Sequence, residues 1–167
     1  GLAPVTDYDG LMYHLVVPRD FLEAGRIFAT PGEAHPNFPL TVDLLFVPAV
    51  AAGLENAARL VHSGFGLLLG IGTYALGRRL IGSHQGGLLG TFVLATTPVL
   101  GTVAGYAHTD VGWVLFEFLA VYALIGGVQD GGDRWVILAG RLAGVGLGSE
   151  CVGGAVLQCG RGGGGWG

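Results

Sequence analysis

Carboxylates gather in a short stretch near the start of the chain, residues 6–20, which reads TDYDGLMYHLVVPRD. It contains three aspartates, among them Asp9, and the neighbouring pair Tyr13 and His14, in a chain in which 12% of the residues are charged. A further carboxylate, Asp110, precedes a long apolar run. One such carboxylate can act as a general base on an acceptor hydroxyl or amine, while the other orients groups or holds a divalent cation against a phosphate leaving group. An apolar body around them suggests a lipid-linked donor.

Each of these residues also has a purely structural interpretation. Asp9 precedes an expected helix, so its carboxylate can cap the helix N-terminus, and the same holds for Asp110. Asp7 reads as a solvated loop residue. A single histidine is more often a hydrogen-bonded structural residue than a metal ligand, and this applies to His14. Capping does not exclude chemistry, so the sequence leaves both interpretations open.

The composition indicates a membrane protein. The chain has 167 residues, of which 51% are hydrophobic, and a mean hydropathy of +0.60, which is high for a soluble globular domain. The net charge of −4 comes from scattered acids, and no basic block suggests a nucleic-acid partner. Cys151 and Cys159 have no CxxC or Cys/His spacing, so we interpret them as inert thiols.

Four apolar runs predict transmembrane helices over residues 60–81, 86–105, 111–128 and 135–157, of which the second is interrupted only by Pro98. The last run has the weakest support because it carries Arg141 and Glu150. The run 40–53 is shorter than the roughly 20 residues that a bilayer crossing needs, so we expect it to lie at the interface. The predicted fold is therefore all-α.

The first acidic stretch and its surroundings predict structure outside the lipid. A short amphipathic helix is expected to follow Asp9, to kink at Pro18 and to stop at Gly25. Together with the interfacial run, this helix makes residues 1–59 an extracytoplasmic loop with juxtamembrane helices, in a polytopic membrane helical bundle. Residues 60–157 form its three to four spans, within a domain over residues 1–159, and the Gly-rich tail 160–167 is expected to be disordered.

Orientation decides whether two of the acids can share a site. Arg78 and Arg79 fill a short loop between apolar runs, and the positive-inside rule places that loop in the cytoplasm. If residues 40–53 do not cross, Asp9 and Asp110 face the same extracytoplasmic side. If they do cross, these two acids lie on opposite sides and cannot form one site.

Four segments together resemble the N-terminal part of polytopic glycosyltransferases of the C-type fold. These enzymes use polyprenyl-phosphate sugars and are related to protein mannosyltransferases and to the aminoarabinose transferases of lipid A. The resemblance runs from about residue 7 to about residue 148 and depends on order and spacing rather than on one diagnostic motif. Its segments are DYDGLMYHLVVPRDFLEAGRI, PNFPLTVDLLFVP, AARLVHSGFGLLLGIGTYALGRRLIG and GYAHTDVGWVLFEFLAVYAL.

The resemblance implies roles for individual residues. Asp9, shortly before Tyr13, matches the catalytic carboxylate of that family, and Asp110 matches a second acid in the next outer loop. Either could also ligate a divalent metal cation. Arg59 stands where relatives commonly carry an arginine that could bind phosphate, although an interfacial arginine with its head group in water explains it equally well. We expect Tyr13 and His14 to bind substrate beside Asp9.

The chain also departs from the family pattern. The first transmembrane helix and the later spans are missing, so the chain reads as an N-terminal fragment that would be inactive alone. Glu150 stands where relatives often have a basic residue, and the sequence beyond about residue 148 looks unlike the family.

The predicted function is transfer of a sugar from a polyprenyl-phosphate carrier to a lipid, glycan or protein acceptor at the outer face of a bacterial inner membrane. Two alternatives stay open: an inactive gene fragment, and a transporter or channel-like bundle in which Asp110 and Glu117 line a solute path. Transport predicts acids at mid-depth and internal repeats. The sequence shows no repeat, and its acids cluster at one rim.

Overall fold

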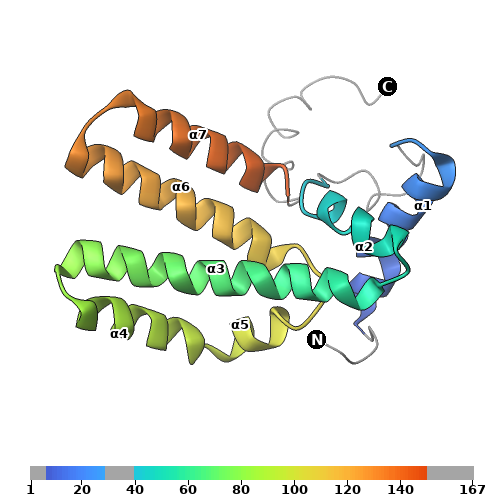
Figure 1. Ribbon diagram of the computed structural model, residues 1–167, viewed down its shortest axis with the longest axis horizontal. Helices are drawn as coiled ribbons and strands as arrows, with labels where there is room; N and C mark the ends of the chain where they lie inside the picture. The colour runs from blue at the N-terminus through green and yellow to red at the C-terminus, as the bar shows by residue number, and fades with distance from the viewer. Residues whose placement is uncertain (1–6, 29–39, 150–167) are drawn as a thin grey trace, which may run out of the picture.

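Helices make up all the regular structure in residues 7–28 and 40–149, the part of the chain that the computed structural model describes (Figure 1). This confirms the predicted all-α helical bundle. The elements in chain order are a π-helical turn Gly10–His14, α1 Val16–Ala24, a 3₁₀ turn Asp43–Leu45, α2 Val47–Ala51, α3 Glu55–Ile81, α4 His84–Ala95, α5 Pro98–Val103, α6 Asp110–Asp130 and α7 Asp133–Leu147.

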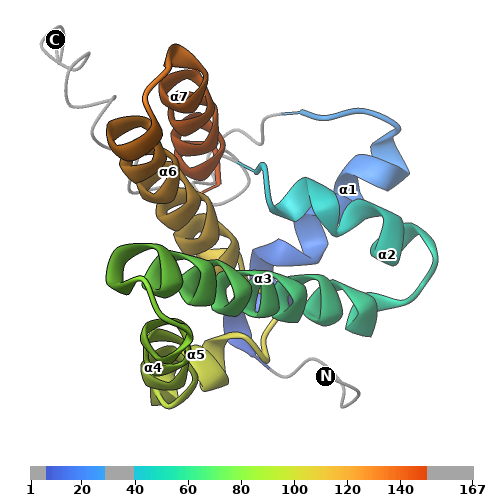
Figure 2. The ribbon, with the colours of Figure 1, turned by 60° about the vertical axis from the view of Figure 1, so that its left-hand side comes forward.

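Helix α3 is the centre of the arrangement. It packs along α4 on one side and along α6 on the other, and α6 also packs along α7. Figure 2 shows α4 and α5 on one side of α3 and the α6–α7 pair on the other. The short helices α1 and α2 lie at the end of the bundle where α3 begins. The chain therefore runs back and forth along one long axis, with its polar loops at the two ends.

Two helices, α3 and α6, are long and apolar enough to cross a membrane, with mean hydropathies of 1.3 and 1.9. Their most apolar windows are only 17% and 33% buried inside the protein. A core helix of a soluble protein would be mostly buried, whereas α3 exposes large apolar side chains such as Leu67 and Ile71. These surfaces suit lipid, and the spans predicted over 60–81 and 111–128 are confirmed as long helices.

The span predicted over residues 86–105 is wrong as a single helix. The chain breaks between α4 and α5, where Thr97 has an extended backbone (φ −75°, ψ 110°). The physical reason is Pro98, because its ring disfavours the helical conformation of the residue before it. The hydroxyls of Thr96 and Thr97 donate to the carbonyls of Phe92 and Val93 at 2.8 and 2.9 Å. The Thr97 hydroxyl thereby gives the Val93 carbonyl a partner at the end of α4, whereas the Phe92 carbonyl also accepts the N–H of Thr96 at 2.9 Å.

The span predicted over 135–157 begins two residues earlier than expected, since α7 starts at Asp133. Helix α7 ends at Leu147, and Glu150, Cys151 and Cys159 lie outside the described residues, as does the tail 160–167. Glu117, which lines the solute path in the transporter alternative, packs against α7. Its Oε1 would lie 2.9 Å from a Cβ added to Gly146.

The first helical segment bends before Pro18 rather than at it. The residues ahead of α1 form a π-helical turn in which the N–H of Leu15 donates to the carbonyl of Gly10 at 3.1 Å. Pro18 then falls in the first turn of α1, where an N–H has no partner within the helix, so the helix tolerates it. The predicted stop at Gly25 is confirmed, with a left-handed φ of 64°.

Residues 40–53 fold as one 3₁₀ turn and the five-residue helix α2, so no helix in this run is long enough to cross a bilayer. Two of its side chains, Val42 and Phe46, are completely buried. They belong to a core cluster that also contains Leu15 and Leu115. This packing fixes the N-terminal segment against the start of α6.

The contact between α3 and α4 depends on glycine. A Cβ added to Gly77 would lie 2.6 Å from the carbonyl oxygen of Gly86, which is backbone and cannot swing aside. Small residues allow two helices to approach this closely, as is typical of packed membrane helices. The Gly77 contact therefore sets the distance at which α4 runs back along α3.

Candidate functional site

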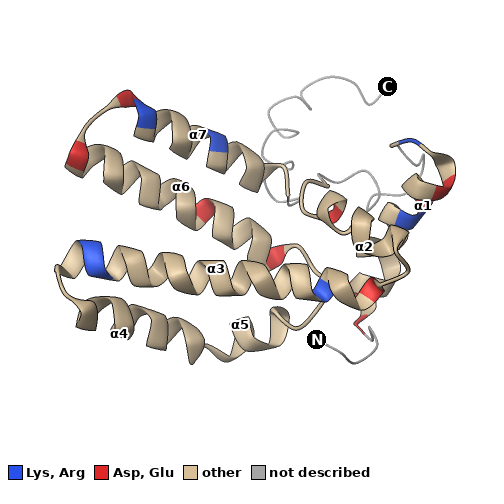
Figure 3. Cartoon of the chain, viewed as in Figure 1, with Lys and Arg blue, Asp and Glu red and all other residues tan. Residues whose placement is uncertain are grey.

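Acidic and histidine side chains meet at the end of the bundle where α3 and α6 begin, and we call this the carboxylate end. It comprises Asp7, Asp9, His14, His108 and Asp110. Figure 3 shows that charged residues are sparse along the helices and concentrate near their ends. A site shared by Asp9 and Asp110 requires both acids on the same side of the membrane. The first acidic segment and Asp110 do lie at the same end of the bundle.

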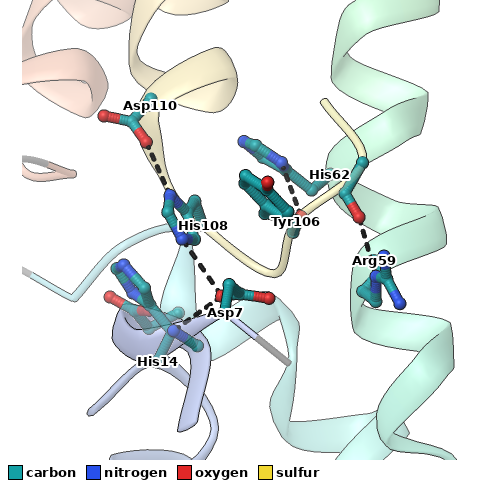
Figure 4. A network of polar contacts seen from close by, with 10 residues as sticks. Asp7, His14, Arg59, His62, Tyr106, His108 and Asp110 are labelled. Atoms are coloured by element: carbon teal, nitrogen blue, oxygen red, sulfur yellow. Dashed lines mark hydrogen bonds and ion pairs between the residues drawn. The ribbon is translucent and has the colours of Figure 1, made fainter. Parts of the chain in front are cut away.

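His108 connects two of these acids (Figure 4). Its Nε2 lies 3.1 Å from Oδ2 of Asp7, and its Nδ1 lies 3.2 Å from Oδ2 of Asp110. An ionised carboxylate can only accept hydrogen bonds, so both ring nitrogens must donate, and the ring is an imidazolium. Burial favours the neutral ring, but the hydrogen bond and charge of Asp110, with the charges of Asp7 and Asp9, outweigh it and raise the pKa of His108.

Asp7 caps the first helical turn, and the interpretation of Asp7 as a solvated loop residue is wrong. Its Oδ2 accepts the N–H of Gly10 at 2.8 Å as well as the bond from His108. The side chain is 7% exposed, and its Oδ1 is buried without a hydrogen-bond partner. The first turn begins earlier than expected, which puts Asp7 three residues before the N–H that needs an acceptor.

Asp9 does not cap that helix, so the capping interpretation is wrong. Its own backbone is helical (φ −67°, ψ −39°), and its side chain makes no capping bond. Within the described residues its half-buried carboxylate has no hydrogen-bond or ion-pair partner. Its charge is the last of the named causes that raise the pKa of His108. Asp9 is therefore a carboxylate without a partner in the described residues, at the same end of the bundle as His108.

Asp110 is the first residue of α6 rather than its N-cap. The N-cap position is held by Thr109, which makes no side-chain capping bond. The N–H of Val111 instead donates to Nε2 of His62 at 3.1 Å. A histidine from α3 thus satisfies the helix terminus, which leaves the Asp110 carboxylate exposed on one side and bonded to His108 on the other.

His62 is completely buried and joins α3 to the loop before α6. Its Nδ1 donates to the carbonyl of Tyr106 at 2.9 Å, while its Nε2 accepts from Val111. One nitrogen therefore carries a proton and the other does not, which fixes a neutral tautomer. His62 is a structural residue that holds the loop carrying His108 in place.

Three polar side chains on one face of α3 hold three successive carbonyls of this loop. Ser63 donates to the carbonyl of Ala104 at 2.8 Å, and Nε of Arg59 donates to that of Gly105 at 2.7 Å. His62 holds the third. Part of the Arg59 guanidinium is thus engaged with the backbone, and its expected role in binding phosphate stays a prediction.

His14 is paired with a buried acid that the sequence did not connect to it. Its Nδ1 lies 2.6 Å from Oδ1 of Asp43, and both side chains are buried. The ring of Tyr13 lies 4.1 Å from that of His14, and the His108 ring lies 5.4 Å from it. The structural interpretation of His14 fits this pairing, and roles of Tyr13 and His14 in binding substrate stay predictions.

A divalent cation was expected on Asp9 and Asp110. Residues 7–28 and 40–149 contain no group of three His, Cys, Asp or Glu side chains arranged to hold a metal ion. The His108 ring also occupies the space between Asp7 and Asp110. The described side chains do not fit a cation without further ligands, so the metal role stays a prediction and no chemical step here depends on it.

Sequence reasoning missed His62 and His108 as organising residues. His62 lies inside an apolar span, where a polar group needs a partner, and this position could have identified it as an organising residue. His108 stands two residues before Asp110 in the motif YAHTD, so proximity to a candidate acid could have identified it. The Asp7–His108 contact joins residues 101 positions apart, and spacing gave no sign of it.

Comparison of the sequence with known families identifies the family of the chain. The profile of the dolichyl-phosphate-mannose-protein mannosyltransferase family matches residues 42–157, more than half of the chain. The chain belongs to this family. The match includes Arg59, His62, His108 and Asp110 and begins after Asp9. Family membership confirms the resemblance to C-type-fold glycosyltransferases and, with the two apolar helices, indicates a membrane protein.

The chain is also similar to an uncharacterized protein of Shigella flexneri. It is 26% identical over 121 residues, which cover 71% of this chain and 61% of the relative. The chain therefore spans less than two thirds of that relative's length. No solved structure matches the chain.

Proposed function

We propose that the protein is part of a membrane glycosyltransferase that moves a sugar from a polyprenyl-phosphate carrier to an acceptor on the extracytoplasmic side of a bacterial inner membrane. Family membership supports glycosyl transfer in general terms. The observation that carries the proposal is the Asp9 carboxylate, which has no partner in the described residues and lies at the same end of the bundle as His108 and Asp110.

In this proposal Asp9 is the general base. Its carboxylate takes the proton of an acceptor hydroxyl while the acceptor oxygen forms a bond to the anomeric carbon of the sugar. The bond between that carbon and the phosphate oxygen breaks, and its electron pair leaves with the polyprenyl phosphate. A single displacement of this kind inverts the anomeric centre.

The neighbouring acids already have a partner. Asp7 and Asp110 both accept hydrogen bonds from His108, whereas Asp9 has no partner in the described residues, so the proposal assigns the base to Asp9. The imidazolium adds positive charge next to the place where a phosphate leaving group gains negative charge. Arg59, one turn before His62 on α3, is a second cation for that phosphate.

The donor and acceptor follow from the surroundings of the site. Apolar faces of α3 and α6 are exposed along their length, so a long polyprenyl tail can stay in the bilayer while its phosphate reaches the carboxylate end. The positive-inside rule places Arg78 and Arg79 in the cytoplasm and hence the carboxylate end outside. The acceptor is a lipid, a glycan or a protein that presents a hydroxyl or an amine.

The test is the variant Asp9→Asn in the full-length protein. A panel of radiolabelled polyprenyl-phosphate hexoses and pentoses is supplied to membranes, and transfer of the label to endogenous acceptors is measured. Loss of a general base lowers such a rate by roughly 10²–10⁴-fold. Asp20→Asn is the matched control, because Asp20 is an exposed acid of the neighbouring helix α1. Wild-type transfer by the correctly inserted Asp9→Asn protein would remove Asp9 from the mechanism.

A further inference from the structure

The opposite end of the bundle contains an open groove with a volume of about 610 Å³. Its lining residues belong to the last turns of α3 and α6 and to the middle of α6, and Figure 3 shows the end of α3 far from the carboxylate end. We call it the arginine groove, and its polar and aromatic lining consists of Tyr74, Arg78, Arg79, Tyr122, Gln129 and Asp130. The mechanism proposed above uses none of these residues.

Arg79, one of the two arginines of the groove, is bonded on both sides to other side chains of the protein. Nε of Arg79 donates to Gln129 at 2.6 Å, and another guanidinium nitrogen lies 2.6 Å from the Asp130 carboxylate. The guanidinium carbon also lies 5.8 Å from the centre of the Tyr122 ring and 5.7 Å from that of Trp135. Arg79 therefore joins the end of α3 to the last turn of α6, and Asp130 neutralises its charge.

The second arginine has no compensating acid. Arg78 is exposed and lies with its guanidinium carbon 5.8 Å from the centre of the Tyr74 ring. No carboxylate in the described residues forms an ion pair with it. Tyr74 is itself held by a 2.7 Å hydrogen bond between its hydroxyl and His84. With Arg79 and Asp130 balanced, the groove carries one net positive charge, on a side chain supported by an aromatic ring.

The length of α3 places this charge at the level of lipid head groups. A helix of 27 residues is about 40 Å long at 1.5 Å per residue. The hydrocarbon core of a bilayer is roughly 30 Å thick, so the two ends of α3 extend into the head-group regions. Arginine and tyrosine are the residues that accumulate at this depth. The phosphate groups of phospholipids lie at the same level.

We infer that the arginine groove binds the phosphate group of an anionic phospholipid, with Arg78 as the main contact. A phosphodiester carries one negative charge, which matches the net charge of the groove, and a guanidinium can bind phosphate through two parallel hydrogen bonds. Basic hollows between transmembrane helices on the cytoplasmic side are suited to such head groups. The half-exposed carboxylate of Asp130 can accept hydrogen bonds from head-group hydroxyls, which favours a glycerol head group. This inference does not depend on the transferase proposal.

The test compares lipids on the full chain in nanodiscs. Phosphatidylglycerol mixed into phosphatidylcholine raises the Tm of the wild type above its value in phosphatidylcholine alone. Arg78→Gln loses most of this increase, and its affinity for phosphatidylglycerol is about fivefold weaker, the ratio expected for one basic side chain near an anionic surface. Arg78→Lys keeps part of the increase because it keeps the charge.

The matched control is Arg134→Gln, an exposed arginine at the same end of the bundle but outside the groove. This variant keeps the full increase in Tm. Three results would overturn the inference: equal Tm values of the wild type in the two lipid mixtures, an unchanged increase in Arg78→Gln, or the same increase from inorganic phosphate in phosphatidylcholine nanodiscs. The last result would assign the groove to a free anion rather than to a lipid.

Discussion

The polar side chains at the two ends of α3 differ in burial and in the partners that they bond to. At the carboxylate end, His62 is completely buried and bonds to two backbone groups of the loop before α6. At the end that contains the arginine groove, the Arg78 side chain is exposed and lies over the Tyr74 ring, and Arg79 bonds to side chains of α6. One end is fixed by backbone partners inside the protein, and the other presents charge to its surroundings.

This difference indicates what each end can do. A buried polar group that holds backbone atoms fixes geometry, and its removal leaves unsatisfied partners, so its loss has a large effect. An exposed cation can exchange one partner for another at small cost, which suits binding to a head group. The predictions below use paired variants at the two ends to test this contrast.

The largest effect is expected for His62, and His84, which contacts Tyr74 near the other end of α3, is its comparison. His62→Leu leaves the Tyr106 carbonyl and the Val111 N–H buried without partners, which destabilises the fold by about 2–5 kcal/mol. His84→Leu removes an exposed contact with Tyr74 and changes the free energy of unfolding by about 0.5 kcal/mol or less. Unfolding of the full chain in detergent measures both. Equal losses from the two variants would contradict the contrast.

The second-largest loss of stability is expected from a glycine at the contact between α3 and α4. Gly77→Ala forces α4 away, because the new Cβ would meet backbone at 2.6 Å, and overpacking of this kind costs about 1–3 kcal/mol. Gly64→Ala on the same helix meets nothing within 4 Å, so it leaves stability unchanged or raises it by up to about 1 kcal/mol. Thermal unfolding of both variants separates close packing from helix propensity.

A smaller, pH-dependent effect is expected at the carboxylate end. The folded-state pKa of His108 is raised, because the charges of Asp110 and Asp7 outweigh its burial. The stability that this contributes is complete below about pH 6.5, the ordinary histidine pKa, and is lost as the pH rises through the raised pKa. Hydrogen exchange of the amides of residues 10–15 should therefore become faster at high pH in the wild type.

His108→Gln is the control for this prediction. It keeps a polar side chain but cannot become charged. The exchange rates of the same amides should therefore lack the additional rise at high pH that the wild type shows. A wild-type profile identical to that of His108→Gln would show that the imidazolium does not hold the N-terminal segment.

The smallest effect is expected for an ion pair that lies at the carboxylate end but is exposed. Arg19 and Glu55 join α1 to the start of α3, with side chains 48% and 40% exposed. Exposed pairs contribute about 0.2–1 kcal/mol, so a double-mutant cycle with Arg19→Ala and Glu55→Ala should give a coupling in that range. A larger coupling would mean that position along the bundle, and not burial, decides the effect.

The sequence allowed the main helices to be predicted because their signals are local. Long apolar runs define α3 and α6 without help from tertiary contacts, and the short run before α3 is too brief to cross. The break at Thr97 was predictable in principle, since Pro98 restricts the residue before it. Hydropathy alone hid the break, because both halves of that run are apolar.

The candidate site was harder to predict because its contacts are not local. Asp7 and Asp9 are two residues apart, and which of them caps the helix depends on where the first turn begins. The partners of His14 and His62 come from distant segments, Asp43 and the loop at Tyr106. Residue types indicated that the acids matter, but only the packed structure shows which acid is bonded and which has no partner.

The contact between Asp7 and His108 has a consequence for how the molecule is made. Its two residues are separated by 101 positions in the chain, with α3, α4 and α5 between them. The segment that carries Asp7 is synthesised before α3, yet its partner follows only after α5, and contacts between distant positions form slowly. The proposed reaction centre can therefore assemble only after α3, α4 and α5 have been synthesised.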